Sequence, residues 1–187
     1  MVPPIWVDFS VYILLGLALQ VVPLPWLAGT VLAATVHEIC HYAMAGILGV
    51  KCRAVHISTE GTTMSMAYLT RKEEILIAMA GPVGSFLLVF LIKVFPQLAI
   101  AGLIQGLFNC IPIYPLDGGR VIYRIFETRQ KIAQGIEIFC IFGILICSIL
   151  ISIRWDLGIW PMLWGIWAVC KMIHRKFPCK DGLVRVQ

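Results

Sequence analysis

Two histidines and a glutamate stand close together in an apolar part of the sequence. The segment His37-Glu38-Ile39-Cys40-His41 fits the H-E-x-x-H pattern. On a helix, residues four positions apart share one face, so the two imidazoles can bind one zinc ion. Zinc lowers the pKa of a water ligand to about 7, and Glu38 is spaced to take that proton as a general base. The pattern therefore predicts a metal-dependent hydrolytic site.

A third zinc ligand must come from elsewhere, because a catalytic zinc ion usually has three protein ligands. Asp117 is the best candidate, since prolines interrupt the apolar run before it and two glycines follow it. A broken helix at membrane depth is tolerated only where it lines a cavity or is buried in protein. A distal glutamate is the alternative third ligand. The candidates for it are Glu60, Glu73, Glu74, Glu127 and Glu137.

The composition predicts that most of the chain lies in a lipid bilayer. Of its 187 residues, 60% are hydrophobic and only 13% are charged, whereas soluble domains have about 25% charged residues. So short a chain cannot bury this much apolar surface in a core. We therefore expect an all-α polytopic membrane protein. The positive charge is clustered between apolar segments, which indicates topology and argues against binding of nucleic acid.

Six apolar segments are candidates for transmembrane helices. They are residues 5–22, 26–49, 73–95, 98–113, 132–153 and 157–173. Between the second and third segments, two short runs flank Glu60 and Gly61, which predicts a small β-hairpin. Residues 116–131 are expected to form a connector, and Gly81 with Pro82 is expected to kink the third helix and let it pack closely.

The basic residues predict the orientation of these segments. All of the 15 Lys and Arg residues except Lys93 and Arg154 fall on one side of the predicted membrane. Loops rich in Lys and Arg stay in the cytoplasm. We therefore expect a multi-pass integral membrane protein with both termini in the cytosol.

Three motifs in consecutive segments resemble those of the site-2 protease family. They are H-E-x-x-H, then Ala-Gly-Pro-x-x-Ser from Ala80 to Ser85, then Asn-x-x-Pro-x-x-Pro-Leu-Asp-Gly-Gly from Asn109 to Gly119. The six-segment layout is similar to that of the bacterial proteases that process sporulation sigma-factor precursors. The resemblance implies one membrane-embedded protease domain over residues 1–187 in a bacterial cell membrane. Its three-helix catalytic core would span about 26–122, with accessory spans at 5–22, 132–153 and 157–173.

The resemblance also implies the roles of particular residues. One zinc ion would be held by His37, His41 and Asp117, with Glu38 as the catalytic base and Asn109 near the substrate. The expected activity is hydrolysis of peptide bonds in or near transmembrane segments of membrane-protein substrates, which would release a regulatory factor. A regulatory membrane protein is a further expected partner.

The alternative is a catalytically inactive membrane scaffold or a transporter-like zinc-binding protein. Intramembrane metal ligands also occur in ion pathways. Against this alternative, both ligand motifs and the general base are intact, and the chain has no paired repeats of the kind found in many transporters.

Overall fold

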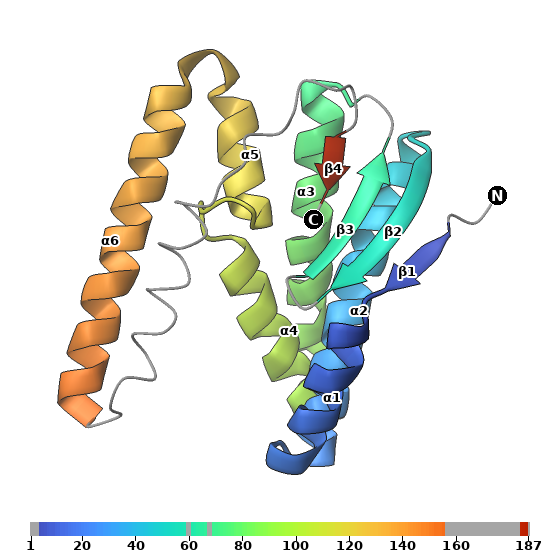
Figure 1. The fold of residues 1–187 in the computed structure, drawn as a ribbon, viewed down its shortest axis with the longest axis vertical. Coiled ribbons are helices and arrows are strands. Elements are labelled where there is room, and N and C mark those ends of the chain that lie inside the picture. Colours follow the sequence, from blue (N-terminus) through green and yellow to red (C-terminus); the bar gives the residue numbers. More distant parts are fainter. Residues whose placement is uncertain (1–3, 59–60, 67–68, 156–183, 187) are drawn as a thin grey trace.

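The fold is mainly helical, with a small sheet packed against the helices (Figure 1). A computed structural model describes residues 4–58, 61–66, 69–155 and 184–186. The α-helices in this part of the chain are α1 (Phe9–Val21), α2 (Leu24–Ile47), α3 (Arg71–Leu87), α4 (Pro96–Asn109), α5 (Asp117–Ile125) and α6 (Gln130–Trp155). Two short 3-10 helices, η1 (Leu88–Leu91) and η2 (Glu127–Arg129), follow α3 and α5. The strands are β1 (Ile5–Val7), β2 (Cys52–Ser58), β3 (Gly61–Met66) and β4 (Val184–Val186).

The predicted hairpin is present in the structure. Strands β2 and β3 pair antiparallel, with Ser58 opposite Gly61 next to the turn. Strand β1 adds to β2 in parallel and β4 adds to β3 antiparallel, so that the sheet order is β1-β2-β3-β4. Met64 and Met66 of β3 are buried against Ala45 of α2 and Ile77 of α3. The hairpin is therefore anchored to the helices by its own apolar side chains.

Helices α2, α3 and α4 pack against one another, and α5 packs against α3. Proline near the first turn begins both α2 and α4, where the missing backbone N–H costs no hydrogen bond. Helix α3 begins with a capping box, in which the Thr70 hydroxyl accepts from the Glu73 N–H and the Glu73 carboxylate accepts from the Thr70 N–H. These local signals divide the apolar sequence into separate helices that can meet side by side.

Two regions differ from the sequence-based expectation. The segment 5–22 begins with the three-residue strand β1, so its helix α1 has only 13 residues. The expected connector 116–131 contains α5, a helix of nine residues. Helix α5 is stabilised by contacts that are distant in sequence, because its two arginines approach Glu74 of α3. The predicted sixth span, 157–173, lies outside the described residues.

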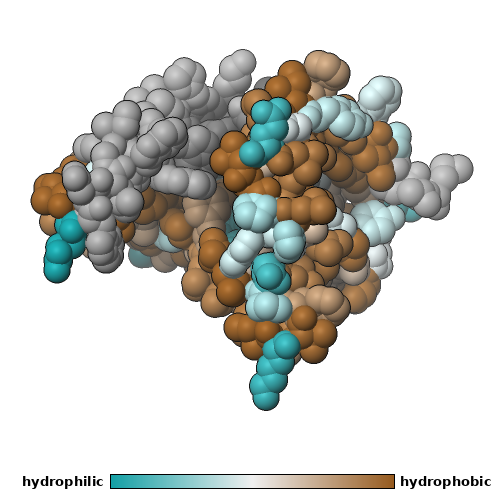
Figure 2. Space-filling view, turned by 90° about the horizontal axis from the view of Figure 1, so that it is seen from below, coloured by the Kyte–Doolittle hydropathy of each residue, from teal (hydrophilic) through white to brown (hydrophobic). Residues whose placement is uncertain are grey.

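The outer surface of the helices is strongly apolar. In the described part of the chain, α3 with η1 and η2 with α6 are long and apolar enough to cross a membrane, and α1 is a shorter apolar helix. On α6, Phe139 is 79% exposed and Ile153 is 77% exposed. Most of the described surface in Figure 2 is hydrophobic. Exposed apolar faces of this extent fit a lipid environment.

Candidate metal centre

Helix α2 presents a narrow buried stripe to the helices beside it. The buried residues recur every fourth position: Gly29, Ala33, His37, His41 and Ala45. Because the other members of the stripe are small, the neighbouring helices approach α2 closely on this face. The two imidazoles are therefore enclosed in protein, with His37 3% and His41 1% exposed.

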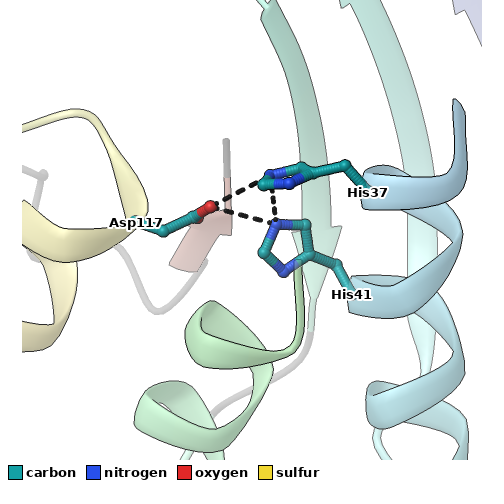
Figure 3. Close-up of side chains that lie close together, drawn as sticks. All are labelled: His37, His41 and Asp117. Carbon is teal, nitrogen blue, oxygen red and sulfur yellow. Dashed lines mark hydrogen bonds and ion pairs between the residues drawn. The ribbon is translucent and has the colours of Figure 1, made fainter. Parts of the chain in front are cut away.

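Asp117, on α5, points toward the two imidazoles from the side opposite α2 (Figure 3). It is the first residue of α5 and is 3% exposed. Its Oδ2 lies 3.1 Å from His37 Nε2 and 3.2 Å from His41 Nε2, and the two Nε2 atoms are 3.1 Å apart. The structure thus brings together the three residues that the sequence suggested as ligands, each with one ligand atom directed at a common point.

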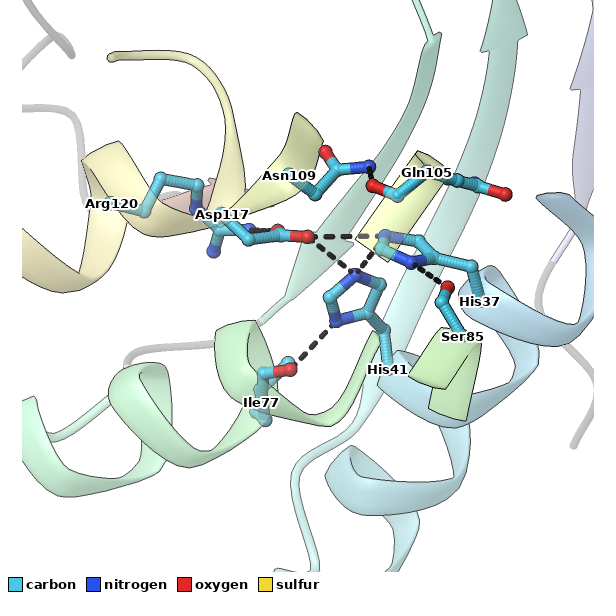
Figure 4. Close-up of polar contacts among 8 residues, drawn as sticks. All are labelled: His37, His41, Ile77, Ser85, Gln105, Asn109, Asp117 and Arg120. Carbon is cyan, nitrogen blue, oxygen red and sulfur yellow. Dashed lines mark hydrogen bonds and ion pairs between the residues drawn. The ribbon is translucent and has the colours of Figure 1, made fainter. Parts of the chain in front are cut away.

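The hydrogen bonds behind the imidazoles orient them for a metal ion (Figure 4). His41 Nδ1 lies 2.7 Å from the backbone carbonyl of Ile77, which can only accept, so Nδ1 carries the proton and Nε2 keeps its lone pair. His37 Nδ1 lies 2.9 Å from the Ser85 hydroxyl. When His37 donates its Nδ1 proton to that hydroxyl, three acceptor atoms about 3 Å apart converge, an arrangement that requires a cation or a proton between them.

The spacing of these atoms fits zinc. In a tetrahedral site with bonds of about 2.0–2.1 Å, the ligand atoms lie roughly 3.3 Å from one another. The observed separations of 3.1 to 3.2 Å are close to that value. Two nitrogens and one carboxylate oxygen are also a donor set that zinc takes in hydrolytic enzymes, with a fourth position left open.

Gly81 of α3 provides the space that the imidazoles occupy. A Cβ atom on Gly81 would lie 2.7 Å from His37 Nε2 and closer still to His41 Nε2. The sequence suggested only a kink and close helix packing for Gly81, since a glycine motif does not reveal what packs against it. The absence of a side chain here is part of the geometry of the centre.

A comparison with protein-family models finds no match. A zinc metalloprotease of Methanocaldococcus jannaschii is 27% identical over 144 residues, which are 64% of this chain and 42% of the relative. The chain therefore matches less than half the length of that curated protein.

The solved site-2 protease from Methanocaldococcus jannaschii superposes on this chain with a TM-score of 0.64 and is 18% identical in sequence. The superposition covers 97% of this chain and 96% of the solved chain. This chain has the fold of a site-2 protease. The resemblance to the site-2 protease family that the sequence motifs predicted is thereby confirmed, and the relative's name agrees with the prediction of zinc.

Within this site-2 protease fold, Glu38 lies beside the three converging residues. Its carboxylate interacts electrostatically with His37, His41 and Asp117, and the side chain of Thr62 in β3 lies close to it. The hairpin therefore reaches the residue that the sequence suggested as general base. Asn109 ends α4 near the centre, and its amide nitrogen donates to the Gln105 carbonyl of the same helix at 3.1 Å (Figure 4).

The second oxygen of Asp117 faces a buried arginine. Arg120, one turn further along α5, places Nη1 3.5 Å from Asp117 Oδ1 and Nη2 4.0 Å from Glu74 Oε1. Arg124 Nε donates to the other oxygen of Glu74. This chain of charges leaves Oδ2 of Asp117 directed at the imidazoles. The role of Arg120 was not predicted from the sequence, although a basic residue directly after Asp-Gly-Gly was a visible signal.

Where the structure describes them, the glutamates considered as alternative third ligands have other partners. Glu73 belongs to the capping box of α3, Glu74 pairs with Arg124, and Glu127 pairs with Arg124 at 3.1 Å. Glu137 accepts hydrogen bonds from Tyr114 and Tyr123. Glu60 lies outside the described residues. Among the described residues, Asp117 is thus the carboxylate that joins the two histidines.

Proposed function

We propose that this chain is an intramembrane zinc metalloendopeptidase that hydrolyses peptide bonds in or near transmembrane segments of membrane-bound substrates. The observation that carries the proposal is the convergence of His37, His41 and Asp117, with Glu38 beside them, inside a fold that exposes apolar helices. We assign the metal to the first three residues and the proton transfer to Glu38. We further propose that the products include a released regulatory factor.

Zinc bound at this centre would supply Lewis acidity toward the scissile carbonyl and toward water. Residues of the chain itself would transfer the proton and hold the metal ligands in place. Glu38 would accept a proton from the attacking water and deliver it to the leaving amine. Ser85 and the Ile77 carbonyl hold the imidazoles in place through Nδ1, and Arg120 supports the carboxylate of Asp117 from the opposite side.

A substrate must bring an accessible backbone carbonyl to the metal centre. The carbonyl groups of a helix are hydrogen-bonded within the helix, so a transmembrane substrate must unwind locally before hydrolysis. Polar or helix-breaking residues near the cleavage site should make this easier. We therefore propose a membrane protein with a transmembrane segment as substrate, and a regulatory membrane protein as a second partner that controls access.

Substitution of Glu38 by glutamine is expected to lower proteolysis by about 10²- to 10⁴-fold, the usual contribution of a general base. Glutamine keeps the size and hydrogen-bonding capacity of the side chain but cannot accept the proton. Membrane-protein fragments from cells making the native chain should be compared with those from cells making Glu38→Gln. New termini within or beside transmembrane segments should appear only with the native chain.

The zinc content of both purified proteins serves as the control for that comparison. Zinc in both, with cleavage by the native chain alone, would support the assignment. Cleavage retained by Glu38→Gln would contradict the role of Glu38. Zinc in both proteins without any fragments would favour a membrane scaffold over a protease.

We also propose that the protein is multi-pass, with both ends of this sequence in the cytosol. In support, the turn between α3 and α4 and the end of α6 lie at the opposite end of the bundle from the start of α3 and the α5–α6 junction (Figure 1). Lys93 lies in the turn between α3 and α4, and Arg154 lies at the end of α6. These are the two basic residues assigned to the outer side of the membrane. Placement in a bacterial cell membrane stays a prediction from the resemblance.

The orientation can be tested with an impermeant thiol reagent, using the native chain as background. A cysteine at Lys93 should be labelled on intact cells, whereas one at Lys51 should be labelled only after permeabilisation. The basic loops remain in the cytosol during insertion, which is the physical reason for this difference. The reverse pattern would invert the proposed topology.

A further inference from the structure

Helix α6 carries a buried carboxylate that the proposed reaction does not use. Glu137 is 1% exposed, although most large apolar side chains of α6 face outward. An acidic side chain within a membrane helix is costly unless it is hydrogen-bonded or paired. The presence of Glu137 in such a helix therefore indicates that its carboxylate has a specific partner.

The partners of Glu137 lie on both sides of Asp117 along the chain. Its Oε1 accepts the backbone N–H of Tyr114 at 3.0 Å, and its Oε2 accepts the Tyr123 hydroxyl at 2.6 Å. Tyr114 belongs to the segment that leads into α5, and Tyr123 lies on α5 itself. One carboxylate thus ties α6 to both ends of the segment that carries Asp117.

Apolar packing reinforces the same contact. Ile141, one turn beyond Glu137 on α6, is buried against Ile113, and Leu116 packs against this pair. The tyrosines also meet each other edge to face, with ring centroids 6.2 Å apart. The buried side of α6 is therefore directed at the residues immediately before Asp117.

We infer that Glu137 is a positioning residue, which holds the segment around Asp117 so that its carboxylate reaches the two histidines. This inference rests on the proposed zinc site. Glu137 does not itself approach the imidazoles; it acts through the backbone of Tyr114 and through α5. Helix α6, which lies outside the three-helix core, thereby becomes part of the support for the metal centre.

The effect of such support on metal affinity can be estimated from other metal sites. Groups that orient metal ligands change metal affinity by about 10- to 100-fold when they are removed. The segment before α5 has its own constraint, because a Cβ on Gly118 or Gly119 would collide with the backbone of residues 110–114. A shift of this segment would therefore be transmitted to Asp117 directly.

The test uses the full-length protein with Glu137→Leu and Glu137→Gln. Leucine fills the space but removes the carboxylate that accepts the Tyr114 N–H. Glutamine can still accept that N–H, and its amide can donate to the Tyr123 oxygen. We expect Glu137→Leu to bind zinc about 10- to 100-fold more weakly in competition with a chelator, and Glu137→Gln to bind almost as the native chain does.

Two further measurements separate this role from general packing. The absorption spectrum of the cobalt-substituted protein should change in Glu137→Leu and be preserved in Glu137→Gln. Glu73→Gln is the control, because Glu73 lies in the capping box of α3, which glutamine can also complete, and it should leave zinc binding unchanged. If Glu137→Leu fails to fold, Tyr123→Phe replaces it, with an expected loss of about tenfold.

Native zinc affinity and an unchanged cobalt spectrum in Glu137→Leu, or in Tyr123→Phe where that variant replaces it, would overturn the role of Glu137. Equal losses in the leucine and glutamine variants would also overturn it, since glutamine can still form a hydrogen bond with each tyrosine. A native chain that binds no zinc would instead overturn the proposed function. The two failures are therefore distinguishable.

Discussion

Replacing Gly81 by alanine is expected to disable the metal centre, although no ligand is changed. The new methyl group would lie 2.7 Å from His37 Nε2 and closer to His41 Nε2, and real Cβ atoms essentially never approach a heavy atom within 3.0 Å. Either the imidazoles must rotate away from Asp117 or α3 must move away from α2. We expect zinc affinity to fall by about 100-fold or more, since both histidines lose their orientation.

The measurement is the zinc content of the purified variant after dialysis against a chelator, together with its proteolytic activity. Gly46→Ala is the matched control, because it makes the same change on α2 where an added Cβ meets nothing within 4 Å. The control should keep its zinc. A Gly81→Ala protein with one zinc per chain and native activity would show that the imidazoles do not occupy the space seen here.

Removal of the Asp117 carboxylate is expected to have an effect of similar size. Asp117→Ala leaves two imidazoles, which bind zinc far less well than three ligands do. It also removes one acidic neighbour of the buried Arg120, so the alanine variant should be less stable as well. Asp117→Asn keeps the shape and removes the negative charge, which separates zinc loss from loss of packing.

Zinc content and the thermal midpoint should be measured for both Asp117 variants. We expect both to lose zinc and activity, and the asparagine variant to keep more of its thermal stability. Full zinc occupancy in Asp117→Ala would contradict the assignment. It would reopen the case for a glutamate as third ligand, with Glu60 as the candidate still without a described position.

The elements that carry the centre were predictable because local signals specify them. The spacing of His37 and His41 follows from the period of the α-helix, and the interrupted apolar run before Asp117 indicates a break near the active site. The hairpin was visible as two short runs around Glu60 and Gly61. These features depend on residues close together in sequence.

The features that were missed depend on tertiary contacts. Helix α5 has only nine residues, and its two arginines approach Glu74 only when α3 packs beside it. Strand β1 forms because it pairs with β2. From the sequence alone, Ile5–Val7 is predicted to be the start of an apolar helix. The relation of Gly81 to the imidazoles likewise required knowledge of how α2 and α3 cross.

Two ligands of the centre, His37 and Asp117, are 80 residues apart in the chain. A metal ion between α2 and α5 would act as a removable cross-link, so metal binding and folding would be thermodynamically linked. At a free zinc concentration of about 100 times Kd, the folded state would gain about 2.7 kcal/mol. The lifetime of this protein in a cell would then depend on zinc supply, even where its activity is not required.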